Sequence, residues 1–149
     1  MSPPTANLPP VWAQWLGAAG LIPFAMLALA LWWPALGYQG TISHALASYG
    51  ATIASFLGAI HWGLAMRSPP GAGAGPYLWG VMPSLLAWLA LLLPPTWGLL
   101  ALAVLLGLCL LVDERRYPHY QLQAWLPRRR RLTLVASLAC LAGAAGLLR

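Results

Sequence analysis

Charged side chains are scarce in this sequence. Only 7% of the 149 residues are charged, whereas 60% are hydrophobic, and a soluble domain carries about 25% charged residues. Lysine is absent, and Asp113 and Glu114 are the two acidic residues. This composition excludes a water-soluble globular protein and predicts an integral membrane protein. The lack of a surface rich in lysine and arginine argues against a nucleic-acid partner.

Apolar stretches bounded by proline, glycine and arginine give the expected architecture. There are five of them, at residues 11–33, 42–66, 77–93, 96–112 and 132–148. The last three are near the lower length limit for crossing a bilayer. A helical hairpin turned at Pro94 and Pro95 would nevertheless have no polar face for water. We therefore expect one all-α integral membrane domain over residues 1–149, a bundle of five transmembrane helices.

The arginines predict the orientation of this bundle. With five spans, seven of the eight arginines fall on one side of the membrane, and Arg149 falls on the other. Cytoplasmic loops carry the excess of positive charge, so we expect a cytoplasmic N-terminus and an external C-terminus. The N-terminal residues show neither a basic signal-peptide region nor an arginine-rich presequence. These features favour a multi-pass protein of the bacterial inner membrane.

Residues 113–131 are expected to form an interfacial loop. Asp113 and Glu114 are expected to pair locally, in a solvated turn, with the arginines that follow them. The basic residues of this loop are Arg115, Arg116, Arg128, Arg129, Arg130 and Arg131. They are interpreted either as a topology signal or as a site for anionic lipid phosphate or an acidic partner.

The expected spans contain no Asp, Glu, Lys or Arg. This argues against proton-coupled transport and aspartyl intramembrane proteolysis, because both need ionisable groups at depth. No Gly-x-Ser-x-Gly motif is present, and Cys109 and Cys140 are expected to be reduced and structural. His44 and His61 would lie about 25 Å apart and point in different directions, so they cannot share a metal or haem. We expect no catalytic residue, metal or cofactor.

The second apolar segment carries most of the expected buried polarity. A helical period places His61 on a face of small residues, with Ala47, Gly50, Ala54, Gly58 and Ala65. His44, Ser48, Thr52 and Ser55 lie on another face. We expect His61 to hydrogen-bond to Ser84 or to the backbone near Pro83 in the third apolar segment. Trp62 and Trp88 could line a pocket for a flat apolar molecule there.

Four segments carry a resemblance to a known family. They are YGATIASFLGAIHWG at residues 49–63, LGAAGLIPF in the first apolar segment, PSLLAWLALLLP in the third, and LVD closing the fourth. The sequence resembles the transmembrane-protein-69-like family, a domain of unknown function found in proteobacteria and mitochondria. The resemblance implies a small polytopic inner-membrane protein whose SFLGAIHWG segment is the functional surface. In size and topology alone, it is also similar to the translocator-protein family.

Two hypotheses of function follow from these observations. The first is a non-enzymatic accessory or assembly subunit that acts through helix–helix contacts in a larger membrane complex. The alternative is a binder or carrier of a small apolar ligand, such as a quinone, porphyrin or lipid, between the second and third apolar segments. The expected partners are the lipid bilayer, anionic lipid and other membrane subunits. The candidate functional positions are Ser55, Gly58, His61, Trp62, Gly63, Ser84 and Trp88.

Overall fold

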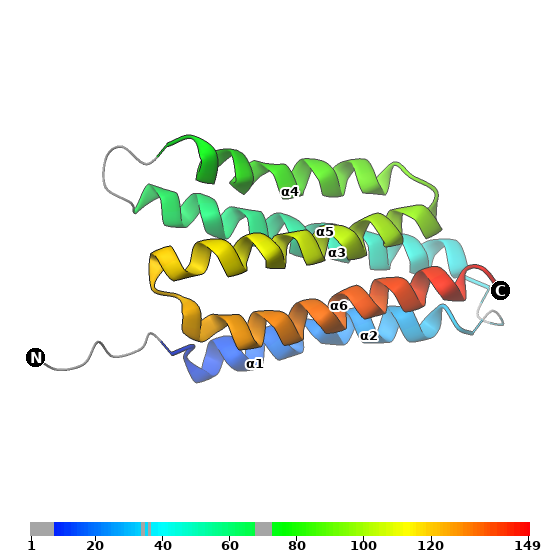
Figure 1. Cartoon of the computed structure of the whole chain (residues 1–149). Helices are drawn as coiled ribbons and strands as arrows, with labels where there is room; N and C mark the ends of the chain where they lie inside the picture. Colours follow the sequence, from blue (N-terminus) through cyan, green and yellow to red (C-terminus); the bar gives the residue numbers. More distant parts are fainter. Residues whose placement is uncertain (1–7, 34, 36, 68–72) are drawn as a thin grey trace, which may run out of the picture.

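The computed structural model describes residues 8–33, 35, 37–67 and 73–149, and its regular structure is helical. The helices are α1 (Val11–Ala19), α2 (Leu21–Ala30), α3 (Gln39–Met66), α4 (Gly75–Leu91), α5 (Pro95–Arg116) and α6 (Leu126–Gly146). Two short 3-10 helices, η2 (Tyr117–Tyr120) and η3 (Gln123–Trp125), connect α5 to α6. The long helices lie side by side in a bundle, with the start of α1 at one end and the end of α6 at the other (Figure 1).

The first apolar segment is divided at Gly20 into α1 and α2. Pro23 lies in the first turn of α2 and has no N–H to donate to the preceding turn, which explains the break. The Gly20 N–H still donates to the Leu16 carbonyl at 3.0 Å, so the two helices continue in a similar direction. The Tyr49 hydroxyl donates to the Gly20 carbonyl at 2.9 Å and holds α3 against this junction.

Helix α3 packs against α2, α4, α5 and α6 and is the centre of the bundle. The small-residue face expected from the sequence is confirmed, because all of its members are buried. They are Ala47, Gly50, Ala54, Gly58, His61 and Ala65. His44 and Thr52, on the opposite face, are exposed.

Helices α3 and α4 approach closely at Gly58. A Cβ atom added there would lie 2.8 Å from the Gly80 carbonyl oxygen and 3.0 Å from the Pro83 ring. Glycine and proline thus bring the two backbones together at this level, and the expected ligand pocket between these helices stays a prediction for the rest of their length. Among the described residues, α4 and α5 line an apolar hollow, and α1 and α6 line a pocket.

The outer surface of the bundle is strongly apolar. Large hydrophobic side chains are exposed on all six α-helices, including Trp15, Leu29, Phe56, Trp88, Val104 and Leu134. Within the described residues, two stretches are long and apolar enough to cross a membrane, Val11–Ala30 and Pro95–Tyr120, and Gly75–Leu91 is apolar but shorter. An apolar surface of this extent suits lipid better than water.

The expected interfacial loop at residues 113–131 is shorter in the structure. Helix α5 continues through Arg116 and α6 begins at Leu126, so Asp113 belongs to α5, where it is 1% exposed. The expectation that Asp113 lies in a solvated turn after the fourth apolar segment is therefore wrong. The sequence places it at the polar end of the segment, but helix packing buries it.

Substitution of glycine tests the close approach of α3 and α4. Gly58→Ala should destabilise the bundle by about 1–3 kcal/mol, because the new methyl group must displace the α4 backbone. Gly63→Ala should be neutral or stabilise by up to about 1 kcal/mol, because alanine favours helix and nothing lies within 4 Å of that position. Thermal unfolding in detergent measures both. Equal effects would contradict the close-approach argument.

Candidate functional site: a buried ion cluster

Three helices place a histidine, an aspartate and an arginine side chain together at one end of the bundle. The Asp113 carboxylate on α5 accepts a hydrogen bond from Arg129 of α6, whose Nε and Nη2 lie 2.8 and 2.5 Å from Oδ2. Its other oxygen, Oδ1, lies 2.8 Å from Nε2 of His61 on α3. His61 is 2% exposed and Asp113 is 1% exposed. We call these three residues the buried ion cluster.

The helix ends explain how these residues meet. Adjacent residues on a helix point in different directions, so Asp113 turns inward while Glu114 turns toward the surface. Glu114 accepts a hydrogen bond from Arg130 at 2.6 Å, and the Arg130 side chain is 60% exposed. The two acidic residues thus pair with consecutive arginines of α6. The expected local pairing of the acidic residues with Arg115 and Arg116 is wrong.

Neighbouring side chains close the cluster. The Tyr117 ring lies 6.2 Å from the His61 ring, centroid to centroid, and Tyr117 is 4% exposed. Cys109, one turn before Asp113 on α5, is also buried. No member of the cluster lines the apolar hollow between α4 and α5 or the pocket between α1 and α6.

This enclosure limits what the cluster can do chemically. A histidine hydrogen-bonded to a carboxylate resembles the pair used in general-base catalysis, but such a base must reach its substrate. His61 is buried, and its Nε2 is engaged by Asp113. The geometry therefore favours a structural clamp that fixes α3, α5 and α6 relative to one another.

The expected hydrogen bond between His61 and Ser84 is replaced in the structure. The Ser84 hydroxyl donates to the Val81 carbonyl of its own helix at 2.7 Å, and the His61 ring meets Asp113 of α5 instead. The expected pairing is wrong because a buried carboxylate is a stronger acceptor for imidazole than a serine hydroxyl. His61 does face protein, as the small-residue face predicts.

The other candidate positions do not converge on one site. Ser55 donates to the Ala51 carbonyl at 2.9 Å, and Gly63 has open space around it. The Trp62 ring packs edge-on against Tyr77 at 5.3 Å between centroids, and Trp88 is 57% exposed. The two tryptophans therefore present much of their surface outward. They line neither the apolar hollow between α4 and α5 nor the pocket between α1 and α6.

The run of four arginines is divided among different partners. Arg129 and Arg130 pair with carboxylates, whereas Arg128 donates to the side-chain amide oxygen of Gln14 at 2.6 Å. Arg128 and Arg131 both line the pocket between α1 and α6. Arg115 is exposed and Arg116 is half-buried.

Comparison with known proteins assigns the family. A family model described as a protein of unknown function (DUF3429) matches residues 9–145. The chain belongs to the DUF3429 family. A relative in this comparison is Transmembrane protein 69 of Xenopus tropicalis, which is 36% identical over 138 residues. The match covers 88% of this chain and 52% of that protein, so the chain spans about half the length of the curated relative.

The predicted resemblance to the transmembrane-protein-69-like family is thus confirmed. No solved structure matches this DUF3429 chain. Of the segments that carried the resemblance, SFLGAIHWG supplies His61, and the LVD that closes the fourth apolar segment supplies Asp113. The presence of a histidine and an aspartate in two of these segments was the sequence signal available for predicting the buried ion cluster.

Loss of the shared carboxylate should destabilise the protein. Asp113→Ala leaves His61 and Arg129 without their common acceptor, and we expect a loss of about 3–5 kcal/mol in the free energy of unfolding. Arg130→Ala breaks a more exposed pair and should cost less than about 1 kcal/mol. His61→Gln should retain more stability than His61→Ala, because its amide can still donate to Asp113. Thermal unfolding in detergent measures all four variants.

A further variant separates lost pairing from lost packing. Replacing His61, Asp113 and Arg129 together with apolar residues of similar size should recover much of the stability lost in Asp113→Ala, because no unpaired charge stays buried. If Asp113→Ala unfolds at the same temperature as Arg130→Ala, the cluster is not a clamp.

Proposed function

We propose that this chain is a five-pass protein of the bacterial inner membrane that acts as a non-enzymatic accessory or assembly subunit of a larger membrane complex. Support for the membrane location comes from the exposed apolar surface, the two helices long and apolar enough to span and the printed name of the Xenopus relative. The shorter and more polar helices would cross as parts of the same bundle.

The distribution of arginine supports an orientation with the N-terminus in the cytoplasm. Arg67 follows the end of α3, and the arginines at residues 115, 116 and 128–131 lie where α5 ends and α6 begins. These helix ends share one end of the bundle with the start of α1, and the C-terminus is at the other end (Figure 1). Arg149, at that other end, stacks over the Trp32 ring at 4.4 Å.

Action by contact is supported above all by the unpartnered face of α3. We define the outer α3 face as His44, Ser48, Thr52, Phe56, Ala59 and Gly63. Ser48 is partly buried and the other five are exposed. Most of these side chains are small or polar, unlike the leucines and tryptophans that cover much of the remaining surface. Lipid tails offer polar groups no partner, whereas small residues let a second helix approach closely.

The polar groups of the outer α3 face are only partly satisfied within the bundle. The Thr52 hydroxyl donates to the Ser48 carbonyl at 2.9 Å. The Ser48 hydroxyl and the His44 ring lie at the long distance of 3.5 Å, which leaves both groups able to bond more strongly with a partner. A transmembrane helix of another subunit, with small or hydroxyl-bearing residues, would complement this face.

Reporter fusions test the proposed orientation. Fusions after Met66 and Glu114 should report the cytoplasm, and a fusion after Arg149 should report the periplasm, because positive charge is retained on the cytoplasmic side. Paired phosphatase and fluorescent reporters measure this in living cells. A cytoplasmic signal after Arg149 would overturn the five-pass arrangement.

Site-specific photo-crosslinking tests the proposed contact. A photo-reactive residue at Ala59 should capture one membrane polypeptide, because this position is exposed on the outer α3 face. The same residue at Leu138, exposed on α6, is the matched control and should capture lipid alone. Ala59→Trp should abolish co-purification of the captured polypeptide without lowering the unfolding temperature, whereas Leu138→Trp should leave co-purification unchanged.

Two results would overturn the proposal. One is lipid adducts alone at Ala59, which would make the outer α3 face an ordinary lipid-facing surface. The other is capture of a second copy of this chain, which would indicate self-association in place of an accessory role.

A further inference from the structure

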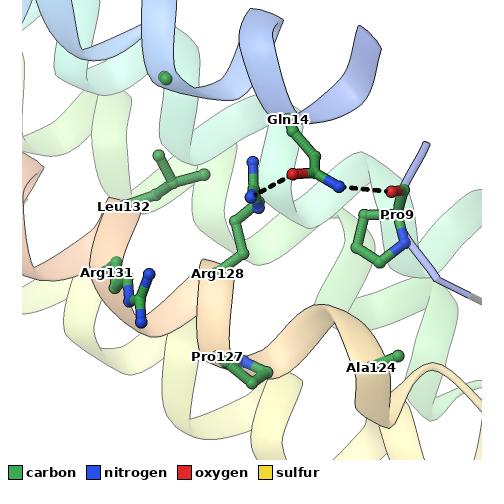
Figure 2. A pocket seen from close by; sticks show the side chains of 8 residues that line it. Pro9, Gln14, Ala124, Pro127, Arg128, Arg131 and Leu132 are labelled. Carbon is green, nitrogen blue, oxygen red and sulfur yellow. Dashed lines mark hydrogen bonds between the residues drawn. The ribbon is translucent and has the colours of Figure 1, made fainter. Parts of the chain in front are cut away.

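A pocket of about 380 Å³ lies between α1 and the first turns of α6. Its lining residues are Pro9, Gln14, Ala18, Ala124, Pro127, Arg128, Arg131 and Leu132. Figure 2 shows Arg128 and Arg131 on α6, with Gln14 and Pro9 across the pocket from them. This pocket belongs to neither the buried ion cluster nor the outer α3 face.

One arginine of the pocket is held in place by a short chain of hydrogen bonds. Arg128 donates from Nη2 to Oε1 of Gln14 at 2.6 Å, and Nε2 of Gln14 donates to the Pro9 carbonyl at 2.8 Å (Figure 2). The guanidinium group of Arg128 is thereby fixed toward the pocket with donors to spare, because arginine has five N–H groups. Its partner is a neutral amide, so its charge is not compensated.

The second arginine lines the same pocket and has no counter-ion within the described residues. Arg131 is exposed and follows Arg128 by three positions, so both lie on the same side of α6. The chain has only two acidic side chains, and they pair with Arg129 and Arg130. No side-chain carboxylate therefore remains for the two arginines of the pocket.

The rest of the pocket is apolar. Pro127, Ala18 and Leu132 line it, and Leu132 packs on Gly17, where its Cδ1 lies 3.2 Å from the position of an added Cβ. The pocket thus has two uncompensated positive charges and, next to them, an apolar wall between α1 and α6, which we call the apolar seam. A free anion would use only the charges, whereas a phospholipid has a phosphate for the arginines and acyl chains for the seam.

We propose that this pocket binds the headgroup phosphate of an anionic phospholipid, with Arg128 and Arg131 as the phosphate ligands. The proposal rests on the membrane location and orientation proposed above, but not on the accessory role. The phosphate lies between the two guanidinium groups, and the glycerol and first acyl carbons follow Ala18 and Leu132. Arg115 and Arg116 lie outside this pocket and contribute only general attraction.

Lipid selection in nanodiscs tests the proposal. The full chain is placed in nanodiscs that contain equal amounts of phosphatidylglycerol and phosphatidylcholine, and native mass spectrometry measures the lipid retained. The wild type should retain phosphatidylglycerol preferentially. Arg128→Gln with Arg131→Gln should lower this preference about tenfold or more, because two charge-assisted hydrogen-bonding groups are lost. The matched control, Arg115→Gln with Arg116→Gln, removes the same charge and should keep most of the preference.

A variant that keeps all the charges distinguishes binding in the pocket from general electrostatic attraction of anionic lipid. Ala18→Trp fills the apolar part of the pocket and should also abolish the preference, while the unfolding temperature confirms that the variants are folded. Equal losses in the Arg128/Arg131 and Arg115/Arg116 variants would overturn the proposal, as would the absence of any preference in the wild type.

Soluble ligands separate a lipid site from a phosphate site. Glycerol 3-phosphate and inorganic phosphate should displace phosphatidylglycerol poorly, because they lack acyl chains. Displacement by either at millimolar concentration would overturn the lipid assignment and indicate a site for free phosphate. Crosslinking from Ala59 is independent of this result, so failure of the accessory role and failure of the lipid site can be distinguished.

Discussion

The buried carboxylate of Asp113 is the constraint on which one end of this bundle depends. A carboxylate that is 1% exposed is stable only where donors surround it, and here the donors come from α3 and α6. Because Arg129 is turned inward to Asp113, its neighbours Arg128 and Arg131 on α6 are left to line the pocket beside α1.

A second constraint, without charge, acts on α3 and α4. The contact of Gly58 with Gly80 and Pro83 is made by backbone and ring atoms, and such contacts replace the hydrophobic driving force that helices lack in lipid. Because this contact uses one face of α3, the small and polar residues of the opposite face are left outside. The same helix is thus a core element on one side and an unpartnered surface on the other.

The sequence was sufficient to predict the features that depend on composition or on the helical period. The apolar segments predicted the helices, and a period of 100° per residue separated Gly58 and His61 from Thr52. It was insufficient for the partner of His61, because a helical period gives the face on which a residue lies but not the rotation of the neighbouring helices. Asp113 was misassigned since nearby arginines offered a local partner, whereas the actual one, Arg129, reaches it only after α6 folds back.

The chain has a large excess of positive charge. It has eight arginines and two acidic side chains, so most of the positive charge needs compensation from outside the chain. The protein places both carboxylates against Arg129 and Arg130, where one pair stabilises the helix packing and the other lies near the surface. The other six arginines have no side-chain carboxylate left to pair with, and two of them, Arg128 and Arg131, line a pocket that also has apolar walls. In the proposed orientation and lipid site, that excess charge is compensated by anionic headgroups of the membrane.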